Sequence, residues 1–282
     1  MLAGTIWRFW WNRNAVSEST YWYERAFAIG GASPKARARA IFGAAHVAEL
    51  QGDSERARIE FEQAAELLRD VGETRWQILA LAHLSGALDR TGDPKRGEEV
   101  LDEAMTLARN TGDVRGAAVI NANRGYHALV RRDEEGATRI LEEALAGHRA
   151  AGDVYGLAVV LSNLAVAAFR RGDLDDAAAR LSESLPLTVS IGDMHTLVET
   201  MGDAAAVVLA RGDTRAAVRL CGANDVLCKA HGYSMGRLEG ELLDEALTDG
   251  RAVLGAEFED EWRAGAELDV TRAVELALEA LS

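Results

Sequence analysis

The chain has 282 residues, 48% of them hydrophobic, so it can bury a sizeable core as two compact domains or one elongated array. Its formal net charge of −14 repels phosphate backbones, which argues against direct nucleic-acid binding. Only three prolines occur among many Ala, Leu, Glu and Arg residues, a composition that favours helices.

The first expected helix pair spans about 2–29 and is rich in aromatic side chains. Residues 1–11 are apolar but carry Arg8, lack a basic leader and are too short to span a bilayer, so we interpret them as a helix of the array. We therefore expect no membrane segment and a cytoplasmic protein. Two hypotheses remain open for the aromatic residues of this pair: they form its core, or some of them form a docking surface. The docking candidates are Trp7, Trp10 and Trp11.

Glycine recurs every twenty residues along the middle of the chain, and most of these glycines are followed by aspartate. A fixed period of this kind predicts a repeat array. One position of the series holds Arg132, where a left-handed backbone would cost about 1 kcal/mol. The glycines of the series are Gly52, Gly72, Gly92, Gly112, Gly152, Gly172, Gly192 and Gly212.

The residues between two successive glycines predict one helix. Leu81, Leu84 and Leu88 recur at helical spacing and line one face. Gly92 then ends that helix in the left-handed conformation, and Asp93 is placed to N-cap the next one. The repeating unit is therefore a helix–turn–helix of forty residues. We expect five such pairs, over 34–71, 74–111, 114–151, 154–191 and 194–231.

The two helices of each pair differ in their small residues. The first carries a small residue near its middle, and the second carries a small residue early and an apolar residue four positions later. Small side chains let neighbouring helices approach closely, and the larger residue fills the gap between pairs. The first helices hold Ala45, Ser85, Gly125, Ala165 and Ala205; the second hold Ala57 and Phe61, Gly97 and Leu101, Ala137 and Leu141, Ala177 and Leu181, and Ala217 and Cys221.

Residues 233–282 break the period and predict a helical capping segment, because an array must cover its terminal apolar face. The expected division is thus an array of about six helix pairs over 1–232 and a cap over 233–282. Three helices are indicated in the cap by Leu238, Leu242, Leu243 and Leu247, by Phe258 and Trp262, and by Val270, Val274, Leu276, Ala277 and Leu281.

The repeats resemble the tetratricopeptide (TPR) repeat in its longer form, because five units agree in phase. The resemblance implies an all-α fold, a right-handed α-solenoid of helix–turn–helix repeats with a period of about 40 residues. The third repeat shows the family order of large and small residues in Leu81, Leu84, Ser85, Leu88, Gly92, Gly97, Leu101 and Ala104.

Three stretches resemble the C-terminal region of large bacterial signal-transduction ATPases, the LuxR, MalT and AfsR-type STAND regulators. They are 2–11 with 21–28, the glycine-punctuated repeats, and 218–278, which includes 220–223 and 258–262. In that family a DNA-binding domain and an ATPase domain lie elsewhere in the protein, and the repeat region senses an inducer or partner. This chain has no GxxxxGK[ST] loop, so the resemblance implies the sensor part alone, as a fragment or a standalone relative.

One position of each first helix, which we call the ladder position, is the main candidate for ligand binding. It holds Gly43, His83, Asn123, Asn163 and Asp203. In TPR proteins the first helices line the concave face, and asparagine here often bonds a bound peptide, since an amide donates and accepts at once. The alternative is that these amides are solvated or bond a neighbouring helix. The expected groove residues are His83, Asn123, Arg124, Tyr126, Asn163, Phe169 and Arg170.

Arg124 occupies a position where the other repeats carry alanine or leucine. A buried arginine needs a partner, so we expect it to pair with a carboxylate or a ligand anion, or else to extend its charged end to solvent.

Catalysis, metal binding and cofactor binding find no support in residue spacing. The six histidines are scattered, and no Cys/His set has zinc spacing. Cys221 and Cys228 lie about 10 Å apart along one helix, too far for a disulfide. We expect no enzyme, catalytic residue, cofactor or metal site.

Two functions remain as hypotheses. The first is a sensor module that binds a peptide, a small inducer or a protein partner in its groove, next to an ATPase or DNA-binding domain N-terminal to this segment. The second is an interaction scaffold that docks through its aromatic N-terminal end.

Overall fold

The computed structural model is built of α-helices, and no strand occurs in residues 6–29, 31–233 and 237–282, the part it describes; side chains are not described at 237–243, 245 and 246. Two N-terminal helices, α1 (Trp7–Trp11) and α2 (Val16–Ile29), come first. The repeats follow as α3 (Pro34–Leu50), α4 (Ser54–Asp70), α5 (Thr74–Arg90), α6 (Pro94–Thr111), α7 (Val114–Val130), α8 (Glu134–Ala151), α9 (Val154–Arg170), α10 (Leu174–Ile191), α11 (Met194–Ala210) and α12 (Thr214–His231). The last helices are α13 (Arg237–Leu254), the 3₁₀ turn η1 (Gly255–Glu257), α14 (Phe258–Ala266) and α15 (Val270–Leu281).

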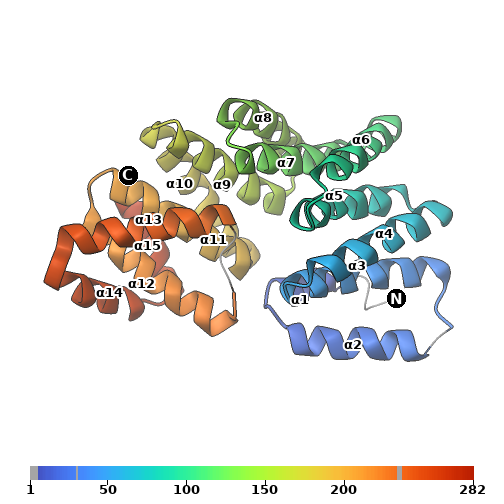
Figure 1. Ribbon diagram of the computed structural model, residues 1–282, viewed down its shortest axis with the longest axis horizontal. Helices are drawn as coiled ribbons and strands as arrows, with labels where there is room; N and C mark the ends of the chain where they lie inside the picture. Colours follow the sequence, from blue (N-terminus) through green and yellow to red (C-terminus); the bar gives the residue numbers. More distant parts are fainter. Residues whose placement is uncertain (1–5, 30, 234–236) are drawn as a thin grey trace. The chain divides into compact units, whose positions relative to one another are not determined.

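The expected all-α solenoid of helical repeats is confirmed, and the helix ends fall where the glycine series placed them (Figure 1). The helices of the cap also match their predicted positions. The side chains of Leu238, Leu242 and Leu243, on which the first of these was predicted, lie outside the described residues.

Most turns of the array are held by one backbone bond and one side-chain bond, as the turn at Gly92 shows. At Gly92 the backbone is left-handed, with φ of 89°, and the Asp93 N–H donates to the Leu88 carbonyl at 2.8 Å. The Asp93 carboxylate then accepts the Arg96 N–H at 3.1 Å and caps α6. Arg132 adopts the same conformation, with φ of 62°, in the turn between α7 and α8.

The alternation of small and large residues sets the distance between neighbouring helices. Every residue that the pattern assigned to it is buried. Gly97 shows the reason most directly, since a Cβ there would lie 3.2 Å from the Ser85 carbonyl oxygen. At Gly125 a Cβ would overlap the side chain of Leu141. The small residues therefore make room for the backbone of a neighbouring helix at Gly97 and for a large side chain at Gly125.

The contacts divide the chain into two compact units. The N-terminal unit comprises residues 1–124 and 146–152, and the C-terminal unit comprises 125–145 and 153–282. The boundaries fall inside α7 and α8. The division into 1–232 and 233–282, which the repeat period predicts, remains a prediction.

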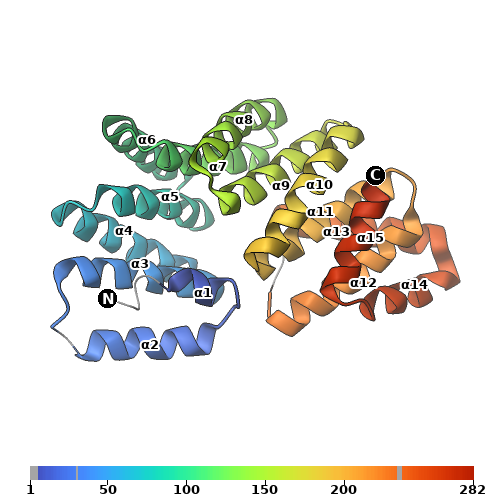
Figure 2. The same ribbon diagram turned by 180° about the vertical axis from the view of Figure 1, so that it is seen from behind.

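In the N-terminal unit α3 lies between α2 and α4, and α1 packs on α3 (Figure 2). Its core is rich in aromatic rings: Phe42 of α3 meets Phe61 of α4 and Trp76 of α5, with ring centroids 5.7 and 5.4 Å apart. Aromatic pairs of this kind add stabilisation beyond the apolar area they bury.

In the C-terminal unit the helices of the cap pack on α10, α11 and α12 (Figure 1). The closest approach is between α12 and α14. A Cβ on Gly222 would overlap the Trp262 carbonyl, and one on Gly265 would overlap the Arg219 backbone. Beside this crossing Glu261 accepts hydrogen bonds from Arg215 at 2.9 Å and from Arg219 at 2.5 Å. Only glycine at both positions allows the helices to come this close.

No helix in the described part of the chain is long and apolar enough to cross a membrane. Cys221 and Cys228 are free thiols, as expected, and burial raises the pKa of Cys221 to about 12.

Candidate functional site

In the N-terminal unit the ladder residue His83 belongs to a cluster with His46 and Glu49, which we call the histidine cluster. His46 and Glu49 lie one turn apart on α3, and His83 projects from α5. The His46 and His83 rings meet edge to face with centroids 4.4 Å apart, and His46 Nδ1 lies 3.1 Å from Glu49 Oε2. One ligand atom from each of the three side chains lies within 4.8 Å of the other two, so this cluster could hold a metal ion.

Aromatic rings hold both imidazoles in place. Trp7 of α1 stacks on His46 with centroids 4.0 Å apart and planes 7° from parallel. Phe61 stacks on His83 at 5.4 Å. His46 is only 2% exposed, whereas Glu49 and His83 are half-buried. The cluster is therefore fully buried at His46 and slightly exposed at Glu49, whose side chain is 12% exposed.

The surroundings of the histidine cluster fix its protonation state. Burial lowers the pKa of His83 to about 3 and lowers the pKa of His46 as well. Burial by itself raises the pKa of Glu49, but the hydrogen bond with His46 and the charge of Arg90 bring it down to about 2. At neutral pH the cluster thus presents two neutral imidazoles and one carboxylate.

Asn123 and Arg124, also in the N-terminal unit, make local contacts. The Asn123 amide donates to the Val119 carbonyl of its own helix at 2.9 Å. Arg124 pairs with Asp102 of α6 and approaches Glu98 at 3.9 Å. Arg124 is thus held by carboxylates of this chain.

In the C-terminal unit the ladder residues are Asn163 and Asp203, 8% and 3% exposed. Ser162 donates a hydrogen bond of 2.7 Å to Asp203 Oδ2, whereas Asp203 Oδ1 is buried and has no hydrogen-bond partner among the described residues. Burial raises the pKa of Asp203 to about 7; the Ser162 hydrogen bond acts against this rise, and the charge of Glu199 adds to it. This carboxyl therefore titrates near neutral pH.

The other predicted groove residues of the C-terminal unit are Arg170, Phe169 and Tyr126. Arg170 donates to the Leu129 carbonyl at 2.9 Å, and its charge lowers the pKa of Asp203. Phe169 packs against the core of this unit, and Tyr126 is half-buried. The structure thus brings Arg170 toward the Ser162–Asp203 pair.

The three tryptophans predicted to dock a partner point inward to different extents. Trp10 is 3% exposed and meets Tyr23 edge to face at 5.2 Å. Trp7 and Trp11 are half-buried and both contact His46. The large side chains that are exposed at this end are Phe9, Tyr21, Trp22, Phe27 and Ile29.

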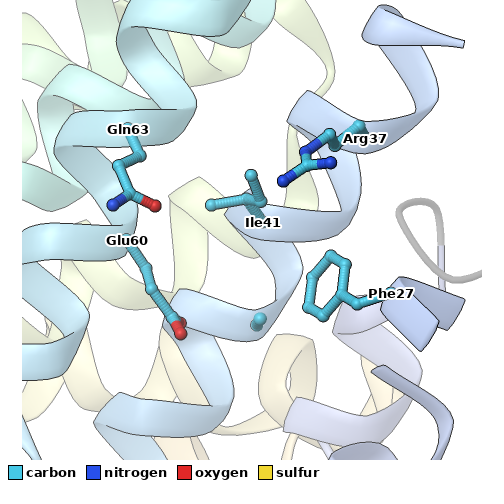
Figure 3. Close-up of a pocket in the computed structure, with 6 residues that line it drawn as sticks. Phe27, Arg37, Ile41, Glu60 and Gln63 are labelled. Carbon is cyan, nitrogen blue, oxygen red and sulfur yellow. The ribbon is translucent and has the colours of Figure 1, made fainter. Parts of the chain in front are cut away.

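A small cavity of about 200 Å³ lies among α2, α3 and α4 of the N-terminal unit. Glu60 and Gln63 of α4 face Phe27, Arg37 and Ile41 across it (Figure 3). Glu60 Oε1 bonds Arg56 at 2.8 Å, and burial raises the pKa of this carboxyl. The volume is below the 300 Å³ or so typical of pockets for drug-sized ligands.

Sequence reasoning placed His83 at the ladder position but missed its partner Glu49. His46 and His83 are 37 residues apart, three fewer than one repeat, so a search for pairs one repeat apart passes over them. The usable signal was His46 followed three residues later by Glu49, one turn apart on the helix beside the one that carries His83. Ser162, the partner of Asp203, was also missed.

The fold and these sites together define a helical repeat protein of the solenoid class. The crystal structure of BtubC (BKLC) from P. vanneervenii is similar, with a TM-score of 0.53 and 18% sequence identity, over 87% of this chain and 91% of that one. At this identity the likeness extends to the fold alone. The sequence matches no protein-family model, and no curated protein matches it.

Proposed function

We propose that the chain is a non-enzymatic binding module whose ladder positions contact a peptide, a small inducer or a protein partner. The observation that carries this proposal is a contrast within the repeats. The small and large packing positions keep small or apolar residues from pair to pair, whereas the ladder position holds Gly43 and then the polar residues His83, Asn123, Asn163 and Asp203. Packing explains the constant positions, and a ligand gives the variable polar ones a role.

A finer part of the proposal is that this module is the sensor region of a bacterial transcriptional regulator acting in the cytoplasm. Two short stretches that carry the resemblance to STAND regulators, 220–223 and 258–262, lie on α12 and α14, the helices that meet at Gly222 and Gly265. Their proximity gives these stretches a common role in packing the end of the array. An ATPase or DNA-binding domain N-terminal to this segment would complete such a regulator, and the charge of −14 fits a module that leaves DNA contact to another domain.

The test selects ligands from a phage-displayed library of random twelve-residue peptides. A selected peptide, labelled with fluorescein, is titrated with the wild-type chain and with two single variants, Asn123→Ala in the N-terminal unit and Asn163→Ala in the C-terminal unit. We expect about fivefold weaker binding, on the order of 1 kcal/mol, for the variant of the unit that binds the peptide, because an amide that pairs with the peptide backbone is lost. Fluorescence anisotropy gives the Kd.

The matched control is Asn110→Ala, which removes an exposed amide from the second helix of a pair, α6. This variant should bind as the wild type does, and circular dichroism should show an unchanged melting temperature for all variants. Equal affinity of both variants and the wild type would remove the ladder positions from the binding site.

The second candidate function is a scaffold that docks through its aromatic N-terminal end. The observation that favours it is the exposure of Phe9, Tyr21, Trp22 and Phe27 on α1 and α2. If a second copy binds there, light scattering will show a dimer that Trp22→Ser dissociates. A monomer at all concentrations contradicts self-association.

A further inference from the structure

We propose that the histidine cluster of His46, Glu49 and His83 is a binding site for a divalent transition-metal ion, with zinc as the expected occupant. This inference concerns a site within the N-terminal unit and does not depend on the proposed function. It sets aside the expectation from the sequence that the chain has no metal site.

The donor set selects the class of metal. Two imidazoles and one carboxylate suit zinc and its neighbours in the transition series, whereas calcium and magnesium prefer oxygen ligands. Three protein ligands also leave a position open for water or another group, as in sites of the two-histidine, one-glutamate type. A thiolate is not among the ligands.

The distances are compatible with this assignment. Ligand atoms about 2.0 Å from a tetrahedral zinc ion lie about 3.3 Å from one another. One ligand atom from each of the three side chains lies within 4.8 Å of the other two. A rotation of the Glu49 side chain that brings the ligand atoms about 1.5 Å closer completes the set.

One buried nitrogen atom of the histidine cluster is a candidate metal ligand. His46 Nε2 is buried and has no hydrogen-bond partner among the described residues. A buried polar atom without a partner is costly, and such atoms are rare in folded proteins. Because Nδ1 is paired with Glu49, the ring can carry its proton on Nδ1 and leave a lone pair on Nε2. A metal cation in the histidine cluster would accept the lone pair of His46 Nε2.

The groups around the cluster support its ligands. Arg90 donates a hydrogen bond to Glu49 Oε1 and leaves Oε2 directed at His46. Such outer contacts hold a carboxylate in position for a metal. Trp7 and Phe61 fix the imidazole planes, which lowers the entropy lost on binding.

The experiment uses the full chain, stripped of metal with a chelator and dialysed. Zinc chloride is titrated into wild type and His83→Asn by isothermal calorimetry, and cobalt chloride is added in parallel to record visible absorption. Asparagine is chosen because the ladder position already holds Asn123 and Asn163 in other repeats, so the variant should fold. We expect one zinc ion per wild-type chain, a raised melting temperature, and at least about tenfold weaker binding by the variant.

The matched control is His195→Gln. His195 also lies near a glutamate on its own helix, with Nδ1 3.5 Å from Glu199 Oε2, but it belongs to the C-terminal unit. This variant should keep the wild-type affinity. Should His83→Asn fail to fold, Glu49→Gln replaces it, with the same loss of affinity expected. The proposal is overturned if the wild type takes up no zinc, or if a folded cluster variant binds zinc as tightly as the wild type does.

Discussion

The ladder position has different neighbours in the two units. In the N-terminal unit two of its three occupants, Gly43 and His83, pack against the aromatic rings of Tyr23 and Phe61, and the third, Asn123, bonds its own helix. In the C-terminal unit Asp203 meets a serine hydroxyl, that of Ser162. The backbone around each position is a continuous helix, so the difference lies in what the neighbouring helices supply. A repeat period thus specifies where a side chain is placed, and non-repeated segments such as α1 and α2 change its chemistry.

The largest effect is expected when asparagine, which other repeats carry at the ladder position, replaces Gly43 beside the Tyr23 ring. In Gly43→Asn the new side chain would overlap Tyr23, which is 2% exposed and has no room to move. We expect a loss of about 3 kcal/mol in the free energy of unfolding, measured by urea denaturation.

The control for this variant is Gly86→Ala in the same unit, where the nearest atom to an added Cβ is the end of the Arg90 side chain at 3.4 Å. Because alanine favours a helix over glycine, this change should raise stability by about 0.5–1 kcal/mol. Unchanged stability of Gly43→Asn would mean that Tyr23 does not fill the ladder position.

The second test addresses the buried carboxyl of the C-terminal unit. The folded chain holds the Asp203 proton up to a pKa of about 7, whereas an unfolded aspartate releases it near 3.8. Between these values the unfolded state binds fewer protons, so this group makes stability fall as pH rises through the window. Asp203→Asn keeps an acceptor for Ser162 and removes the titration, and we expect it to be more stable than the wild type by about 2 kcal/mol at pH 8.

Urea denaturation of both proteins at pH 4, 6 and 8 measures the effect. The two stabilities should converge toward pH 4, where the wild-type carboxyl is protonated in the folded chain. A constant difference across this range would show that Asp203 is ionised throughout.

The smallest expected effect concerns the turn between α7 and α8, where an arginine adopts the left-handed backbone conformation that favours glycine. Arg132 and Gly172 have left-handed backbones, with φ of 62° and 79°, within the same unit. Arg132→Gly should raise the free energy of unfolding by about 0.5–1 kcal/mol, since glycine adopts this conformation without strain. The reciprocal Gly172→Arg should lower it by about 1 kcal/mol. If the two changes have the same sign, local strain is not what distinguishes these turns.

The sequence was sufficient for features that depend on nearest neighbours along the chain. Glycine after all of these helices except α7 and aspartate after most glycines specify the turns, so the ends of α3 to α12 could be predicted. The small and large residues specify packing within and between adjacent pairs for the same reason. These signals act over fewer than forty residues and recur, so each repeat supports the interpretation of the next.

The candidate sites depend on contacts that do not recur. The stack of Trp7 on His46 requires α1 to return onto α3, and no periodic signal specifies that return. The Ser162–Asp203 hydrogen bond joins residues 41 apart, one more than the repeat period. No recurring pattern in the sequence indicates that these two side chains pair. The sequence could therefore locate the ladder position but not the partners that define its chemistry.

The crossing of α12 and α14 bears on how such a chain can lengthen during evolution. Arrays grow by duplication of whole repeats, which succeeds where each new unit presents the same surface to the next. The surface of α12 at Gly222 instead accepts the backbone of α14 itself, with Gly265 opposite Arg219. A copy of an earlier repeat inserted between them would lose this fit, because the position equivalent to Gly222 holds Ser182 or Glu142 there. Duplication is thus more readily tolerated among the earlier repeats, and the end of the array should vary least in length.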